Sequence, residues 1–278
     1  MEDWTKILPS AIRIPVTVYR NQETYDYWIK MGMAYLDIGK TNILVLGRPA
    51  TGKSVLISQL YGEVNAIKYN LPPGSTTTET KAIQFGYWTK IVRTIPGQSS
   101  KNRSTLIEES LKSNKKLNGI LYVVDYGYTM PREQATVDSL INKKDIDTID
   151  KLREHNLRLE LDELKEALVH ILHSINVYGV PSFICIVVNK LDLFHEDLSD
   201  VQNYYDLDGD SEFSHLLREF VQKVGSNNCS VSSMPTSSFK EDFEWNGQRV
   251  VSNIGGDKNQ SLYLRNLLDH ITKISQKR

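Results

Sequence analysis

The residues best suited to chemistry in this chain form an eight-residue segment that runs from Gly47 to Ser54. Its sequence, GRPATGKS, fits the pattern G-x-x-x-x-G-K-S/T, and the apolar run Ile43–Leu46 precedes it directly. Glycines allow such a loop to curl until successive backbone N–H groups face one anion, and a following helix adds the positive end of its dipole. The pattern therefore predicts a phosphate-binding loop between a strand and a helix.

Several positions of this loop have an expected role. Lys53 is expected to reach the β- and γ-phosphates of a nucleotide, and the Ser54 hydroxyl is expected to bind Mg²⁺. Pro49 has no N–H group, so the amides that face the phosphates must come from the residues after it. The residues of this segment that we expect to bind nucleotide are Gly47, Ala50, Thr51, Gly52, Lys53, Ser54 and Val55.

A second group of chemically suited residues follows the run Ile184–Val188, which is typical of a strand buried on both faces. The segment Asn189–Asp192 (NKLD) stands at the end of this strand, where ligands of an open α/β sheet bind. The Asp192 carboxylate can accept hydrogen bonds from the guanine N1–H and N2 amino groups, a pair of donors that adenine lacks. The segment therefore predicts a guanine nucleotide, and an ordinary turn after a strand is the alternative.

In their order along the chain, these motifs resemble the G1 to G5 motifs of Ras-like small GTPases. The resemblance identifies Gly47–Ser54 as G1 and Asn189–Asp192 as G4. It implies that Asn189 braces the base pocket, that Lys190 lies along the base and that Asp192 reads guanine. It also implies GTP and GDP as ligands, with Mg²⁺.

Three weaker motifs are assigned by the same resemblance. Thr78-Glu79-Thr80 resembles switch I, in which Thr78 would contact Mg²⁺ and the γ-phosphate, although a β-branched strand edge is the alternative. The run TIPGQ, from Thr94 to Gln98, occupies the place of G3. The run PTSS resembles G5 and would bring backbone N–H groups near Ser238 to the guanine carbonyl; the candidate binding residues there are Ser237 and Ser238.

Thr94 departs from the common G3 pattern, in which this position is an aspartate. The T-x-P-G-Q form is similar to that of the MglA-like group of prokaryotic Ras-type GTPases, which implies a bacterial or archaeal relative. A threonine keeps hydrogen-bonding capacity but lacks the negative charge that acts on Mg²⁺ through its water shell, so we expect weaker metal affinity. The N–H group of Gly97 is still expected to sense the γ-phosphate.

Catalysis on this reading is the transfer of a phosphoryl group to water, which needs an aligned water, a bound metal and a cation. Gln98 would orient the water, Ser54 with Thr78 would hold the metal, and Lys53 would supply the positive charge. Arg48 is a candidate arginine in cis, and a surface position or an ion pair with an acid is its alternative. Without a further arginine, hydrolysis is expected to be slow.

The elements that must position these residues alternate between strand and helix along the chain. The predicted strands are 42–46, a pair within 81–95, 119–125, 182–188 and 229–233, and the predicted helices include 53–61, 212–224 and 260–275. A stripe of leucines and isoleucines from Leu161 to Ile175 predicts a long helix that docks on the sheet, with a partner-binding seam as the alternative. The alternation predicts the α/β class, with a mostly parallel, doubly wound sheet. The resemblance refines this to a Ras-like P-loop NTPase sandwich of three layers.

Residues 41–278 are expected to form the nucleotide-binding domain, with insertions near 126–150 and 240–258. Residues 1–40 precede the first core strand and are expected to pack on the domain or on a partner. Within the second insertion, the Asn246-Gly247 step predicts a hairpin turn.

Composition excludes several classes of protein. The 278 residues include 33 basic and 34 acidic side chains, and a net charge of −1 gives no overall field that attracts nucleic acid. The chain contains no run of 18 apolar residues, so the sequence predicts no integral membrane segment, and we expect a cytoplasmic protein. The two cysteines, Cys185 and Cys229, lie in apolar runs and are expected to be buried thiols.

The function that the sequence favours is a guanine-nucleotide switch. It would recruit a protein effector in the GTP state and release it after slow hydrolysis, with an activating protein as a further candidate partner. The alternative is a pseudo-GTPase scaffold, which Thr94 motivates. A P-loop ATPase or kinase is a third reading, which Asn189 and Asp192 disfavour.

Overall fold

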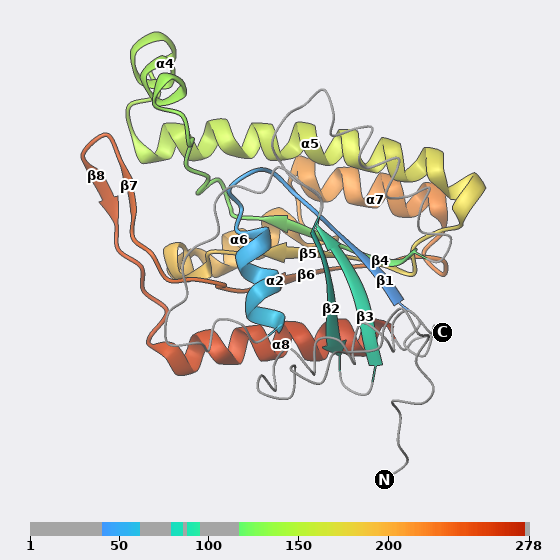
Figure 1. Ribbon diagram of the computed structural model, residues 1–278. Helices are drawn as coiled ribbons and strands as arrows, with labels where there is room; N and C mark the ends of the chain where they lie inside the picture. Colours follow the sequence, from blue (N-terminus) through green and yellow to red (C-terminus); the bar gives the residue numbers. More distant parts are fainter. Residues whose placement is uncertain (1–40, 62–78, 86–87, 95–116, 276–278) are drawn as a thin grey trace, which may run out of the picture.

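A six-stranded sheet in the order β2-β3-β1-β4-β5-β6 runs through the molecule in the computed structural model (Figure 1). The structure describes residues 41–61, 79–85, 88–94 and 117–275. Neighbouring strands pair in parallel from β3 to β6, and only the edge strand β2 is antiparallel to its neighbour. This arrangement brings the carboxyl ends of β1, β3, β4, β5 and β6 to one edge of the sheet.

The strands of the sheet are β1 (Thr41–Leu46), β2 (Glu79–Phe85), β3 (Trp88–Thr94), β4 (Leu117–Val124), β5 (Phe183–Val188) and β6 (Ser230–Pro235). The helices are α2 (Lys53–Tyr61), α4 (Gln134–Lys144), α5 (Ile149–Tyr178), α6 (Leu198–Tyr205), α7 (Glu212–Val224) and α8 (Asp257–Ser275). Two short 3₁₀ turns, Leu191–Leu193 and His195–Asp197, follow β5, and a separate hairpin consists of β7 (Phe243–Trp245) and β8 (Gln248–Val250).

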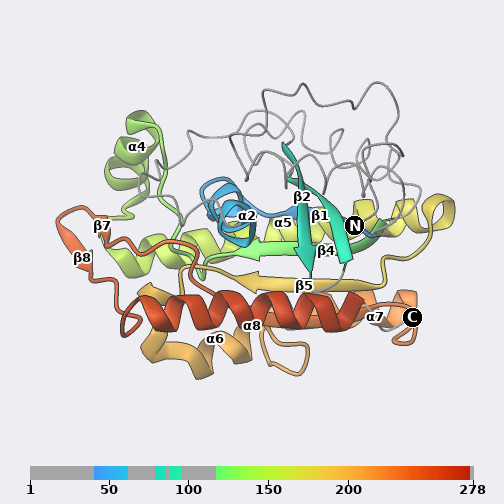
Figure 2. The ribbon, with the colours of Figure 1, turned by 60° about the horizontal axis from the view of Figure 1, so that its bottom comes forward.

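Helices cover both faces of the sheet and create two hydrophobic cores. On one face, α2 and α8 pack against side chains such as Ile43, Leu121 and Val187. On the other face, α5, α6 and α7 pack against alternate residues of the same strands, such as Leu44 and Ile186 (Figures 1 and 2). Because both faces are covered, all six residues of β5 are buried, which explains its uninterrupted apolar sequence.

The longest helix, α5, begins and ends at residues with clear local signals. The Thr148 side chain accepts a hydrogen bond from the Lys151 N–H at 3.3 Å, and Gly179 follows the last turn with a φ of 88°. Its Leu152, Leu164 and other buried residues face the sheet, so the predicted leucine stripe serves core packing.

Helix α4 and the β7–β8 hairpin lie together at one end of the molecule (Figures 1 and 2). The Trp245 indole N–H donates to the Ile146 carbonyl at 3.0 Å, and the Gln248 side chain accepts from the Ile149 N–H at 2.8 Å. Asn246 and Gly247 have φ values of 46° and 78°, as the predicted hairpin turn requires.

Most of the predicted elements are confirmed, including the helices at 53–61 and 212–224 with the same bounds. Two helices inside the expected connections were not predicted. In α4 only Leu140 is buried, so its sequence has little apolar periodicity, and α6 has just eight residues. Both cysteines are buried as predicted, and burial raises the pKa of the Cys185 thiol to about 12.

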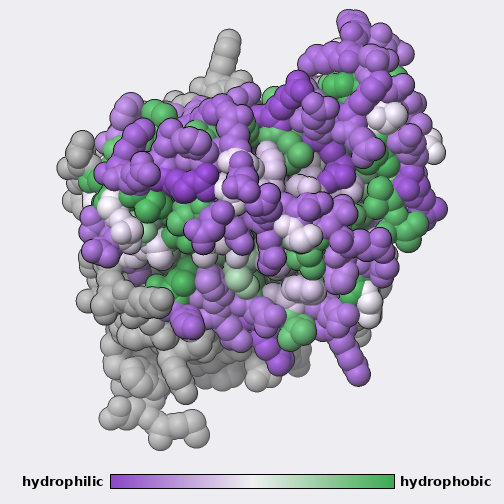
Figure 3. Space-filling view, turned by 180° about the vertical axis from the view of Figure 1, so that it is seen from behind, coloured by the Kyte–Doolittle hydropathy of each residue, from purple (hydrophilic) through white to green (hydrophobic). Residues whose placement is uncertain are grey.

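The surface seen in Figure 3 is mostly hydrophilic, and hydrophobic side chains occur on it in small separate groups. Large hydrophobic side chains that are exposed are Val169, Val251 and Leu262. Among the described residues, no helix combines the length and the apolar character that a membrane span requires.

Candidate functional site: a phosphate loop joined to a base pocket

The loop from Gly47 to Ser54 joins the carboxyl end of β1 to the first turn of α2. Gly47, Ala50 and Gly52 have φ values of 135°, 62° and 86°, so the loop curls through conformations that side chains disfavour. A Cβ atom on Gly47 would lie 2.1 Å from the Val123 carbonyl oxygen of β4. Glycine is therefore needed there for the close approach of two backbones, and the helix begins directly after the loop.

Lys53 lies over the mouth of this loop. Its Nζ donates to the carbonyl oxygens of Gly47 at 2.7 Å and of Arg48 at 2.5 Å, and the Thr51 hydroxyl also donates to the Arg48 carbonyl at 3.0 Å. These bonds hold the ammonium group against the carbonyl oxygens of the curled loop, and Lys53 as a whole is only 7 % exposed. Ser54 follows as the second residue of α2, and Val55 lies next to it.

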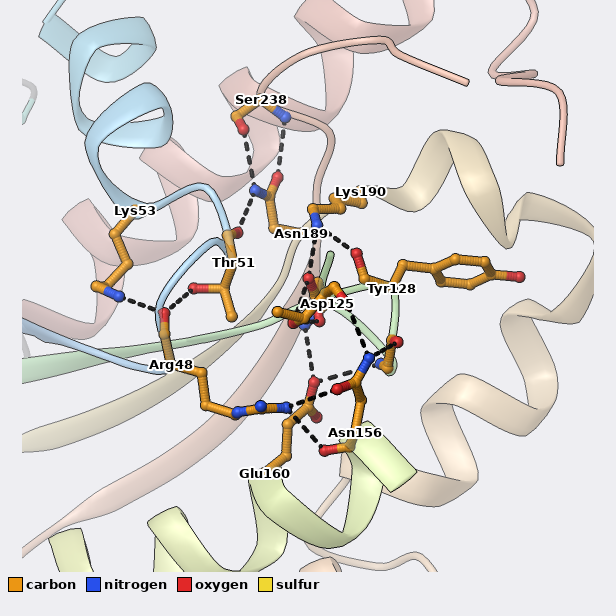
Figure 4. Close-up of polar contacts among 12 residues, drawn as sticks. Arg48, Thr51, Lys53, Asp125, Tyr128, Asn156, Glu160, Asn189, Lys190 and Ser238 are labelled. Atoms are coloured by element: carbon orange, nitrogen blue, oxygen red, sulfur yellow. Dashed lines mark hydrogen bonds and ion pairs between the residues drawn. The ribbon is translucent and has the colours of Figure 1, made fainter. Parts of the chain in front are cut away.

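Asn189 joins three parts of the chain that are far apart in the sequence (Figure 4). Its Nδ2 donates to the Thr51 carbonyl at 2.8 Å and to the Ser238 hydroxyl at 2.9 Å, while its Oδ1 accepts from the Ser238 N–H at 2.9 Å. The Ser238 carbonyl in turn accepts from the Gln59 side chain of α2 at 2.7 Å. The ends of β1, β5 and β6 are thereby bound into one site.

A pocket of about 490 Å³ adjoins this junction. Ala50, Gly52 and Val55 line it from the phosphate loop and α2, and Asn189, Lys190 and Asp192 line it from the end of β5; Ser238, Phe239 and Phe243 are among the remaining lining residues. Its size lies within the range of ligand pockets. The predicted G1, G4 and G5 segments therefore border one cavity.

The Asp192 carboxylate is 2 % exposed and is held by two hydroxyl groups. Ser237 donates to Oδ1 at 2.7 Å, and Ser252 donates to Oδ2 at 2.8 Å. Ser252 belongs to the second insertion, after the β7–β8 hairpin, and the N–H of the next residue, Asn253, donates to the Asp192 carbonyl at 2.8 Å. The predicted insertion therefore holds the Asp192 side chain and, through residues such as Phe243, lines the same pocket, which the sequence did not indicate.

Lys190 extends toward the end of β4. It has a left-handed backbone with a φ of 61°, and its Nζ donates to the Asp125 carboxylate at 2.7 Å and to the Tyr128 carbonyl at 2.5 Å (Figure 4). Lys190 also lines the pocket, while its ammonium group is paired with a fully buried acid. Of the N–H groups near Ser238 that were predicted to face a guanine carbonyl, the one of Ser238 itself donates to Asn189.

Arg48 points away from the mouth of the loop toward α5. Its Nη1 donates to the Asn156 carbonyl at 3.1 Å and to the Asn156 Oδ1 at 3.3 Å, and its Nε lies 3.5 Å from Glu163 Oε1. The predicted alternative of an ion pair with an acid is therefore what the structure contains, and this arginine braces the loop against a helix.

Three of the residues predicted for switch I and G3 lie outside the described residues. They are Thr78, Gly97 and Gln98, so their roles as switch and catalytic residues stay predictions. Thr94 is the last residue of β3, where its Cα pairs with Val45 of β1. The start of the G3 motif is therefore next to the strand that leads into the phosphate loop.

Sequence reasoning missed the residues that brace the site from behind. Asn156 donates to the carbonyls of Gly127 and Thr129, both at 2.8 Å, and Glu160 lies one turn further along α5. Two features of the sequence could have indicated these residues. Asn156 and Glu160 are polar residues on the side of α5 that otherwise carries apolar residues, and Asp125 stands at the end of an apolar strand.

These features together define the class of the protein. The sheet order, the curled loop between β1 and α2 and the meeting of three strand ends at one pocket are those of the P-loop GTPase fold, with an α/β sheet that is mostly parallel. Residues 42–177, just under half of the chain, match the family model of the 50S ribosome-binding GTPase. No curated protein matches the chain.

Comparison with solved structures finds similar chains of low sequence identity. Toc33 from Arabidopsis thaliana, in complex with GDP and Mg²⁺, is 13 % identical and has a TM-score of 0.47, with 99 % of this chain and 97 % of that chain covered. The mammalian SRP receptor is 15 % identical with a TM-score of 0.47, over 84 % of this chain and 99 % of that one. The assignment of the fold rests on the order of the strands, on the loop between β1 and α2 and on the match of residues 42–177 to the family model.

Proposed function

We propose that this protein is a guanine-nucleotide switch that binds GTP and GDP with Mg²⁺, hydrolyses GTP slowly and recruits a protein effector in the GTP state. The observation that carries the proposal is the convergence at the 490 Å³ pocket. The phosphate loop borders it on one side and the Asp192 carboxylate on the other, and Asn189 is hydrogen-bonded to both the loop and Ser238.

The chain's own groups would bind the two ends of the nucleotide by different means. Phosphate oxygens would accept from the loop amides and from Lys53, which would exchange carbonyl partners for stronger charge-assisted bonds. The base would present two donors to Asp192, a carboxylate whose burial makes any mismatch costly. Gln98 is proposed to align the attacking water, and Lys53 to neutralise charge that develops on the phosphoryl oxygens.

The metal site is proposed from the kind of donor available. Ser54 presents an oxygen donor on the first turn of α2, and Thr78 is its proposed companion. The nearby buried carboxylates have other partners, because Asp125 is paired with Lys190 and Asp192 with two serines. Mg²⁺ keeps several waters and binds phosphate oxygens, so a site with few protein ligands suits it. When bound, Mg²⁺ would neutralise charge on the phosphates.

Nucleotide titration tests the proposal directly. Fluorescent GTP and ATP analogues are titrated with and without Mg²⁺, and phosphate release is then followed. We expect saturable GTP binding that Mg²⁺ strengthens, weak ATP binding and slow turnover that Gln98→Ala abolishes. Tighter binding of ATP than of GTP would refute the guanine assignment.

Asp192→Asn tests the base contact. An amide at this position pairs better with xanthine, which has a carbonyl where guanine has the N2 amino group, so preference should move toward xanthine nucleotides. Asp269→Asn, an exposed residue of α8, is the matched control and should leave the preference unchanged. Unchanged guanine affinity in Asp192→Asn would contradict the contact.

A pseudo-GTPase scaffold is the second candidate, and Thr94 in place of the G3 aspartate favours it. Tight GTP binding without turnover, unaffected by Gln98→Ala, would support the scaffold over the switch. The further proposals are a relation to the prokaryotic MglA-like group, a cytoplasmic location, an activating protein as partner, and residues 1–40 as an extension packed on the 41–278 domain or on a partner.

A further inference from the structure

Two carboxylates lie side by side in the core behind the base pocket. Asp125 follows the last residue of β4 and Glu160 is in the middle of α5, and both are 0 % exposed. The N–H groups of Asp125 and Gly127 donate to Glu160 Oε1 at 3.4 Å and 3.3 Å, and the Tyr205 hydroxyl donates to Oε2 at 2.6 Å. Such a pair is expensive to bury with both groups ionised, and no motif of the proposed switch uses it.

The pair is connected directly to the guanine-binding segment. Asp125 accepts from the Thr129 hydroxyl at 2.9 Å and from Lys190 Nζ at 2.7 Å. Lys190 has a left-handed backbone, which is unfavourable for a residue with a side chain, so its conformation must be held by contacts. The ion pair and the bond to Tyr128 are the contacts that hold it (Figure 4).

The same turn of α5 also holds the phosphate loop. Asn156 lies four residues before Glu160 and therefore on the same face of the helix. Its carbonyl and side-chain oxygens accept from Arg48, and its Nδ2 donates to the carbonyls of Gly127 and Thr129 (Figure 4). One helical turn thus contacts the loop after β1, the junction after β4 and, through Asp125, the segment after β5.

The groups around Glu160 favour its neutral form. Asp125 faces it from the junction after β4, Tyr205 and Tyr204 face it from α6, Arg48 faces it from the phosphate loop, and Lys190 reaches it through Asp125. Burial first, and then the Asp125 charge, raise the pKa of Glu160 to about 8. A neutral Glu160 beside the ion pair of Asp125 and Lys190 leaves these three groups without net charge. Loss of the proton from Glu160 leaves a buried negative charge.

We propose that Asp125 and Glu160 are positioning residues that act through Lys190 to hold the segment Asn189–Asp192 in its guanine-binding conformation. The inference rests on the proposed guanine-binding function and adds to it a pair of residues outside the five motifs. When the proton is lost, repulsion between the carboxylates strains the junction after β4 and adds negative charge behind an anionic ligand. Guanine affinity should then fall.

A double-mutant cycle separates positioning from general support of the fold. GTP affinity is measured for the wild type, Asp125→Asn, Lys190→Met and the double variant, with circular dichroism to confirm folding. Asp125→Asn should weaken GTP binding at least roughly tenfold in the wild-type background and less than about twofold in the Lys190→Met background. Equal effects in both backgrounds would overturn the inference.

The pH profile of GTP affinity is the second measurement, and it decides the case if Asp125→Asn does not fold. Between about pH 6 and pH 8.5 the wild type should lose several-fold in affinity, whereas Glu160→Gln should keep the affinity of the neutral form and a flatter profile. Comparing variants removes the contribution of proton loss from the base itself. Glu154→Gln, an exposed residue of the same helix, is the matched control and should follow the wild type.

Two failures remain distinguishable. Saturable GTP binding by the wild type, with the same pH profile in Glu160→Gln, would overturn this inference and leave the guanine-binding proposal intact. Absence of saturable GTP binding by the wild type over the whole pH range would overturn both.

Discussion

The two faces of the sheet are packed in different ways. Against α2 and α8 the hydrophobic core consists of side chains such as Ile43, Phe183 and Leu267. Against α5 a similarly buried core encloses Asp125 and Glu160. The apolar core of the first face contributes stability through the burial of apolar surface. The second uses directional bonds to join three strand ends, so we expect substitutions there to change binding before they change the fold.

The largest expected effect comes from the apolar face. Phe183 is fully buried at the start of β5, far along the strand from Asn189, and it fills the space over Gly119. Phe183→Ala should reduce the free energy of unfolding by about 3–5 kcal/mol because it leaves a cavity. Urea denaturation measures the loss. If the folded variant also lost its preference for GTP over ATP, the proposed separation of the two faces would be wrong.

The next largest effect concerns the face that contains Glu160 and is a dependence of stability on pH. The pKa of Glu160 is about 8 in the folded protein and 4.5 for the ordinary group, so the folded state retains a proton that the unfolded chain has lost. Stability from this group is therefore fully present below pH 4.5 and falls as the pH rises toward 8, by about 2–3 kcal/mol between pH 6 and pH 8. Urea denaturation across this window should show the slope in the wild type, and Glu160→Gln should flatten it. A parallel slope in the variant would assign the effect to other groups.

Gly52→Ala should act on the site rather than on either core. Gly52 has a φ of 86°, and a Cβ there would lie 2.4 Å from Asn189 Nδ2. The bond from Asn189 to the phosphate loop must then lengthen or break, and GTP affinity should fall by about 2 kcal/mol, or roughly thirtyfold. Gly256→Ala, where a Cβ meets open space, also has a positive φ and serves as the control. Equal losses of GTP affinity in both would contradict a local cause.

The smallest effect concerns the insertion that closes the base pocket. Ser252→Ala removes one donor from Asp192 and should lower the free energy of unfolding by about 1 kcal/mol. Urea denaturation with Ser261→Ala, an exposed residue of α8, as reference measures it. Equal stability of the two variants would show that the bond from Ser252 to Asp192 does not stabilise the fold.

The sequence specified those parts of the site whose chemistry is local. Gly47–Ser54 and Asn189–Asp192 each carry their signal within a few residues, because a curled backbone needs glycines at fixed spacing and a strand end needs a polar segment directly after it. The bounds of the helices 53–61 and 212–224 were also predictable from local signals. At the start of the second helix, Ser211 is the cap residue, and its Oγ accepts from the Ser214 N–H at 2.9 Å.

Tertiary structure alone decided which distant side chains meet. No local pattern pairs Lys190 with Asp125, 65 positions apart, or brings Ser252 to Asp192, 60 positions away. Local sequence patterns reflect interactions between residues that are close in the chain, whereas the partner of a buried charge depends on how the strands and helices pack together. The sequences of the loop Gly47–Ser54 and of the segment Asn189–Asp192 were therefore set locally, whereas the buried carboxylate pair behind them was set by the packing of α5 against the end of β4.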